Sequence, residues 1–198
     1  MLAVRCVFLV LILAALPQRI HAEIEGIADP QRDKHQIILM WWPKVVPPDD
    51  WVHDRDASYE NYINMFVPKG QDFANASAVM YARAVYYEKG ETVKELDQAI
   101  KDDHRGFLGR YPDAKVEEVE AVKTGDGTSL RTFSFTPTTK GHWELVAYGR
   151  EPKYVLFFCV SATSKEGLEK NRAAFLTMEA SYTSKDERGD ESPPPSRR

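Results

Sequence analysis

The stretch WELVAYGREPKYVLFFCVSATSKEGLEKNRAAFLTMEASY, from Trp143 to Tyr182, decides the fold of this chain. Within it, nearly every residue from Tyr154 to Ala162 is apolar or small, which is typical of a strand covered on both faces. The turn residues GREPK separate this strand from the preceding strand, WELVAYG, so the two are expected to pair. We therefore expect Tyr154 to Ala162 to lie in the interior of a sheet.

A helix is predicted directly after this strand. Thr163 stands three residues before Glu166, a spacing that allows the threonine oxygen and the glutamate to cap the first helical turn. Apolar residues then recur at helical spacing, so one side of the helix is expected to pack on the sheet while the charged side stays in water. The inward residues are Leu168, Phe175, Met178 and Tyr182.

The chain upstream supplies the other predicted elements. Two strands rich in aromatic and β-branched residues come first, and a capping box at Thr92 and Glu95 then begins an amphipathic helix. Gly125-Asp126-Gly127 is a turn that joins the strands of a hairpin. Sequential hairpins and two amphipathic helices predict an α+β domain with an antiparallel central sheet. The predicted strands cover residues 61–67, 78–87, 114–123 and 130–136, with Phe133 and Phe135 on one face, and the helix has Val93, Leu96, Ile100 and Phe107 as its inner stripe.

Residues 1–22 have the pattern of a signal peptide. Arg5 precedes an eleven-residue apolar run from Cys6 to Leu16, which is too short to span a bilayer, and the small residue Ala22 is the expected cleavage site. An uncleaved membrane anchor is the alternative. Cleavage leaves a chain of about 176 residues, enough for one domain, that does not span a membrane and is exported to the periplasm or the extracellular space.

The mature chain is acidic. Cleavage removes two of the 26 basic residues and none of the 30 acidic residues, so the net charge becomes about −6. No basic field is available for nucleic acid, and the expected partner is a protein or an envelope component. Residues 184–198 are charged and rich in proline, and we expect them to be a disordered tail. The sequon at Asn75 is interpreted as a chance occurrence.

The segment 23–57 is expected to be irregular, with at most a short strand at Ile37 to Met40, because four prolines lie between Pro30 and Pro48. It carries the candidate interaction surface, which consists of Trp41, Trp42, Trp51, His53, Asp54 and Asp56. Exposed aromatic patches are common docking sites, whereas buried tryptophans would simply cover the edge of the core. The histidine and the two aspartates are also the first residues to consider for a divalent cation, although their spacing matches no established metal motif.

Catalytic motifs are not found in the sequence. There is no phosphate-cradling glycine loop, no GxSxG elbow and no HExxH, and no histidine has the spacing of a catalytic or metal pair. Cys159 shares a strand face with Val155 and Phe157, which predicts an inert buried thiol. Asp102, Asp103 and His104 point in different directions around the first helix and are expected to form a solvated surface. We therefore predict no catalytic residue, no resident metal and no cofactor.

The span from Ser58 to Tyr182 resembles the PsbP/Mog1-like superfamily, to which bacterial DcrB-like proteins also belong. The resemblance rests on NYINMFVPKGQDFANASAVMYARAVYY, on the helix beginning TVKELDQAI, on the paired hairpins and on the closing strand and helix. It implies an α/β/α sandwich over residues 58–183. Members of this superfamily are accessory or binding proteins, including an extrinsic photosystem II subunit and a regulator of the GTPase Ran. No residue-level binding motif of these branches matches this sequence.

These observations predict an exported, non-enzymatic accessory or binding protein of the cell envelope. A carrier of a small ligand or a divalent metal is one alternative, with His53, Asp54 and Asp56 as the first candidate ligands. An envelope hydrolase is the other alternative, and a pocket lined by titratable groups would favour it.

Overall fold

β9 (Tyr154–Ala162) lies in the middle of a nine-stranded antiparallel sheet in the computed structural model, which describes residues 24–28, 39–87, 92–138 and 141–183. It pairs along its whole length with β5 (Ala78–Tyr86) on one side and with β8 (Trp143–Glu151) on the other. All of its residues after Tyr154 are buried. The prediction of an interior strand is therefore confirmed.

Beyond β8 the sheet continues with β7 (Ser129–Thr136) and ends at β6 (Lys115–Lys123). The turn between these two strands contains Gly127 at φ 85°, and Asp126 accepts a hydrogen bond from the Thr128 amide at 3.0 Å. The glycine and the aspartate thus have the turn roles that the sequence predicts. Phe133 and Phe135 both face the same side of the sheet, as predicted.

The N-terminal segment is more regular than the sequence predicts. It contributes β1 (Ile24–Ala28), β2 (Leu39–Pro43) and β3 (Trp51–His53), and a short helix, α1 (Arg55–Asn61), precedes β4 (Asn64–Pro68). The strand predicted from residue 61 begins at Asn64, because Tyr62 ends α1 in the left-handed conformation at φ 58°. Both β4 and β2 pair with β5, at Asn64–Phe66 and at Trp41 respectively. Residues 1–22 and 184–198, interpreted as signal peptide and tail, lie outside the described residues.

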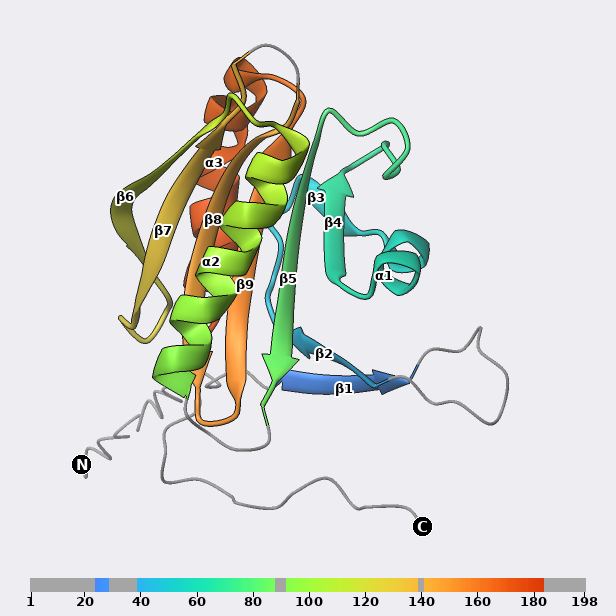
Figure 1. The fold of residues 1–198 in the computed structure, drawn as a ribbon. Coiled ribbons are helices and arrows are strands. Elements are labelled where there is room, and N and C mark those ends of the chain that lie inside the picture. The colour runs from blue at the N-terminus through green and yellow to red at the C-terminus, as the bar shows by residue number, and fades with distance from the viewer. Residues whose placement is uncertain (1–23, 29–38, 88–91, 139–140, 184–198) are drawn as a thin grey trace, which may run out of the picture.

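The two long helices cover opposite faces of the sheet (Figure 1). α2 (Thr92–Arg110) buries Ile100 and Phe107 against one face, together with Phe157 and Cys159 of β9. α3 (Lys165–Ala180) packs on the other face, next to Phe158 and Val160 of the same strand. The domain is therefore an α+β protein with an α/β/α sandwich architecture. All four inward residues predicted for the last helix are buried, namely Leu168, Phe175, Met178 and Tyr182.

Two local predictions need correction. α3 is capped by Ser164, whose hydroxyl oxygen accepts a hydrogen bond from the Gly167 amide at 2.9 Å. Thr163 lies between the end of β9 and this cap, and its amide donates a hydrogen bond to the carbonyl of Ser77. The polar side of α2 is not simply solvated. Asp103 accepts a hydrogen bond of 2.5 Å from the Tyr148 hydroxyl, and the ring of His104 lies 4.7 Å from the Phe133 ring. Both side chains therefore help to attach the helix to the sheet.

Candidate functional site

The predicted tryptophan surface is mostly buried. Trp42 is 4% exposed and Trp51 is 6% exposed, so both indoles contribute to the interior of the domain. Trp41 is half-buried, and its ring lies 5.9 Å from the Tyr86 ring and 5.4 Å from the Tyr154 ring. The bulk of the aromatic area in this segment therefore covers the core, which the sequence offered as the alternative to docking.

His53, Asp54 and Asp56 have structural contacts instead of a common ligand position. Asp54 caps α1 by accepting a hydrogen bond from the Ala57 amide at 3.1 Å, and His53 is hydrogen-bonded to the Ser58 hydroxyl at 3.0 Å. Asp56 is exposed in the first turn of α1. Among the described residues, no group of three or more histidine, cysteine, aspartate or glutamate side chains could hold a metal ion. The three residues are therefore not supported as metal ligands.

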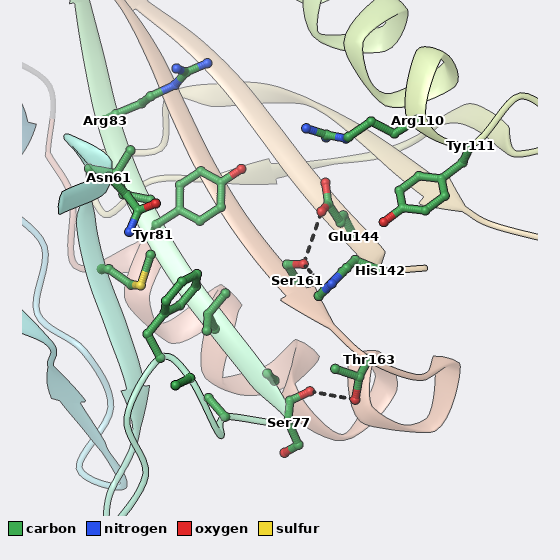
Figure 2. Close-up of a pocket in the computed structure, with 17 residues that line it drawn as sticks. Asn61, Ser77, Tyr81, Arg83, Arg110, Tyr111, His142, Glu144, Ser161 and Thr163 are labelled. Carbon is green, nitrogen blue, oxygen red and sulfur yellow. Dashed lines mark hydrogen bonds between the residues drawn. The ribbon is translucent and has the colours of Figure 1, made fainter. Parts of the chain in front are cut away.

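A cleft of about 610 Å³ opens on the face of the sheet that α2 covers (Figure 2). Its floor is formed by neighbouring residues of three central strands, because Val79 of β5 and Glu144 of β8 are both in register with Ser161 of β9. The other walls come from β4, from the loop between β4 and β5, and from the end of α2. Segments far apart in the sequence thus meet around one cavity.

Glu144 and Ser161 form the polar centre of this cleft. The Ser161 hydroxyl donates a hydrogen bond to the Glu144 carboxylate at 3.1 Å, and the same hydroxyl lies 3.3 Å from Nδ1 of His142. Burial raises the pKa of Glu144 from 4.5 to about 7, and the negative charge of Asp103 acts in the same direction. The Ser161 hydrogen bond and Arg110 partly oppose this shift in pKa. Glu144 therefore changes its charge near neutral pH.

Two arginines line the same cleft. Arg83 extends from β5, and its guanidinium carbon lies 4.2 Å from the centroid of the Phe157 ring. Arg110 is the last residue of α2, and in Figure 2 its side chain extends over the cleft near Glu144. Neither arginine takes part in the ion pairs found among the described residues, which join Arg105 and Arg131 to carboxylates. The cleft thus carries two cationic groups.

Gly141 allows the backbone next to His142 to pass close to the Tyr111 ring, and both of these side chains line the cleft. Gly141 has φ +148°, and a Cβ atom at this position would lie 2.7 Å from Cε1 of Tyr111. Because a real side chain would overlap the tyrosine ring, only glycine lets this loop pass beneath Tyr111 and bring His142 to the cleft.

The serine, histidine and glutamate do not form a catalytic triad. In a triad the histidine stands between the nucleophile and the acid, because it receives the proton of the nucleophile while the acid holds its other ring nitrogen. Here the serine is the central group, and it contacts both the carboxylate and the histidine. The contacts of Ser161 hold Glu144 and His142 in fixed orientations, and they do not pair the histidine with the glutamate as a triad requires.

This site was not predicted from the sequence, although three strand residues indicate it. Arg83, Glu144 and Ser161 are polar residues inside three strands that read as central and apolar. A charged side chain in such a strand needs a polar environment, so these positions indicate a place where the core opens. Period-two alternation also places Val79, Tyr81 and Arg83 on one face of β5.

The fold and the cleft define an α/β/α sandwich with a ligand-sized opening on one face of its sheet. No helix of the described part of the chain is long and apolar enough to cross a membrane. No family model matches the chain, and no curated protein matches it. The chain is similar to the solution structure of cyanobacterial PsbP (CyanoP) from Synechocystis sp. PCC 6803, with 15% identity, a TM-score of 0.43, and coverage of 86% of this chain and 98% of that chain.

Proposed function

We propose that this chain is an exported, non-enzymatic binding protein of the cell envelope, and that its ligand site is the cleft around Glu144. The observation that carries the proposal is the size and polarity of this cleft. A volume of about 610 Å³ lies within the range of small-molecule sites, and such sites combine apolar walls with a few oriented polar groups. Glu144, Ser161 and the two arginines are groups of this kind.

Titratable groups line the cleft, which is a feature that a hydrolase would also need, but the hydrogen bonds of the polar centre favour binding over hydrolysis. The Ser161 hydroxyl has one proton, and the Glu144 carboxylate accepts it. Cys159, the other nucleophile of this strand, is fully buried, and burial raises the pKa of its thiol well above the usual range. A thiol that stays protonated and enclosed does not attack a substrate.

Filling the cleft is expected to abolish ligand binding. Ala76 lines the cleft from a surface loop, so Ala76→Trp places an indole in the cavity with little effect on the core. Lys69→Trp is the matched control, because Lys69 is exposed and does not line the cleft. Amide shifts in nuclear magnetic resonance spectra, recorded with a library of neutral, anionic and cationic fragments, report the binding.

We expect at least one fragment to shift the amide signals of Val79, Tyr81 and Glu144 in the parent protein and in Lys69→Trp. The same fragment should leave these signals unshifted in Ala76→Trp. The proposal fails if no fragment of any charge shifts these amides. It also fails if the tryptophan at position 76 leaves the shifts unaltered.

Export is expected to leave Glu23 as the first residue of the mature protein. The apolar run and Ala22 support this step, and the short hydrophobic length argues against retention as a membrane span. Mass spectrometry of protein recovered from the envelope or the medium of an expressing bacterium measures the new N-terminus. Recovery of the chain only from the cytoplasm, with residues 1–22 still attached, would contradict export.

A further inference from the structure

We propose that the ligand of this cleft is a small amphipathic monocarboxylate, with its carboxylate between Arg83 and Arg110 and its apolar part against β4 and the following loop. This inference rests on the proposed function, because it names the ligand class of the same site. It comes from the composition of the cleft, which is lined by two arginines and also by apolar side chains of the β4 region, of β5 and of the loop between these strands.

Arg83 is the first residue that favours an anionic ligand. Its side chain is half-buried over the Phe157 ring, and its Nε atom is buried with no hydrogen-bond partner among the residues that the structure describes. The aromatic face balances part of the positive charge but accepts none of the directional hydrogen bonds of a guanidinium. Leaving such donors unsatisfied away from water is unfavourable, and a carboxylate supplies the two parallel acceptors that match a guanidinium.

Arg110 is the second residue. It lies close enough to Glu144 to lower the pKa of that carboxyl, yet the two form no ion pair among those found in the described residues. Its guanidinium therefore remains able to bind an incoming anion. The exposed position at the end of α2 also allows the side chain to adjust when a ligand enters.

Apolar side chains form much of the remaining lining of the cleft. Ile63 and Met65 contribute from the β4 region, Val79 from β5, and Phe73 from the loop between these strands. Phe73 is 45% exposed, which is unusual for a large aromatic side chain that lines a cavity. A ligand with an aromatic or short aliphatic body would cover these side chains and remove the Phe73 ring from water.

The charges around the cleft favour a single negative charge on the ligand. The ionisable groups around Glu144, including those that line the same cleft, are Arg83, Arg110, Asp103, His142, Tyr81, Tyr111, Tyr148 and Cys159. Two arginines are opposed by Asp103 and by Glu144 in its ionised form, so a doubly charged phosphate monoester would meet more repulsion than a carboxylate. When Glu144 gains a proton, one negative charge disappears and the carboxylate is expected to bind more tightly.

The test uses calorimetry of the mature chain with three compounds that share one 2-phenylethyl body, namely 3-phenylpropanoate, its neutral amide and 2-phenylethyl phosphate. We expect the carboxylate to bind at least about 10-fold more tightly than either of the others, a factor that corresponds to one good charged contact. Arg83→Gln and Arg110→Gln are each expected to weaken carboxylate binding at least about 10-fold. Arg105→Gln is the control, since Arg105 lies on the same helix and pairs with Asp102 at 2.8 Å.

Measurement at about pH 6 and pH 8 adds a second readout. The parent protein is expected to bind the carboxylate several-fold more tightly at the lower pH, and Glu144→Gln is expected to lose this difference. Because Arg110 is exposed, its replacement leaves the fold intact even if Arg83→Gln does not fold.

The inference is overturned if the amide or the phosphate binds as tightly as the carboxylate, or if both arginine variants retain the parent affinity. Those results leave the cleft as a binding site for another class of ligand. Absence of any fragment binding in the cleft, by contrast, removes the proposed function itself.

Discussion

Replacing Glu179 by methionine is expected to raise the free energy of unfolding by about 3 kcal/mol at pH 7. Glu179 lies on α3 with 0% of its surface exposed, and within the described part of the chain both buried carboxyl oxygens lack a hydrogen-bond partner. Burial raises its pKa from 4.5 to about 9. The folded protein must therefore keep this carboxyl protonated and without hydrogen bonds at neutral pH, which costs free energy. A methionine of similar volume removes that free-energy cost.

The effect of Glu179 is expected to depend on pH with a definite sign. Its folded pKa of about 9 lies above the unfolded value near 4.5, so its contribution to stability is fully present below about pH 4.5. That contribution is lost as the pH rises toward about 9, and the gain from Glu179→Met grows over the same range. Urea denaturation at several pH values measures this gain.

Two variants make the Glu179 result specific. Glu169→Met changes an exposed glutamate on the same helix and is expected to alter stability by less than about 0.5 kcal/mol. Glu179→Gln removes the ionisable group but keeps buried polar atoms without hydrogen-bond partners. It should therefore abolish the pH dependence and raise the free energy of unfolding by less than methionine does. A gain from methionine that is constant from pH 5 to 9 would show that the carboxyl is not buried as described.

The sandwich could be predicted from sequence because its central elements have strong local patterns. The run from Tyr154 to Ala162 is apolar on both faces, and the stripe that ends in Met178 and Tyr182 has helical spacing. These patterns reflect burial against the nearest layer. The N-terminal strands lack such a pattern. β1 and β2 pair with each other, and β2 joins the rest of the sheet through a single pair of facing residues, Trp41 and Ala84.

The cleft could not be predicted in the same way, because it depends on register and on where a helix ends. Glu144 and Ser161 lie 17 positions apart in the chain and become neighbours only through the pairing of β8 with β9. Arg110 reaches them because α2 stops beside this part of the sheet. Spacing rules for motifs describe neighbours along one element, whereas this site is assembled across several elements.

Replacing Phe157 by alanine is expected to lower the free energy of unfolding by about 3–5 kcal/mol and to weaken carboxylate binding. The side chain is 4% exposed, and its ring lies 5.4 Å from the Tyr148 ring on the α2 side of the sheet. It also supports the Arg83 guanidinium, which lies 4.2 Å from its centroid. Removing the ring therefore leaves a cavity and also releases Arg83 from its position in the cleft.

Phe158→Ala is the matched comparison, because the next residue of β9 faces α3 and lies 5.2 Å from the Tyr182 ring. It is expected to destabilise the domain by a similar amount of about 3–5 kcal/mol while leaving carboxylate affinity unchanged. Phe157→Leu keeps most of the apolar volume but removes the aromatic face, so it should lose affinity with a smaller loss of stability. Urea denaturation and calorimetry measure the two quantities separately. The Arg83 guanidinium lies on the α2 side of β9, so only the two changes at Phe157 should affect it. If Phe157→Ala, Phe157→Leu and Phe158→Ala all bind the carboxylate as tightly as the parent protein, the Phe157 ring does not position Arg83.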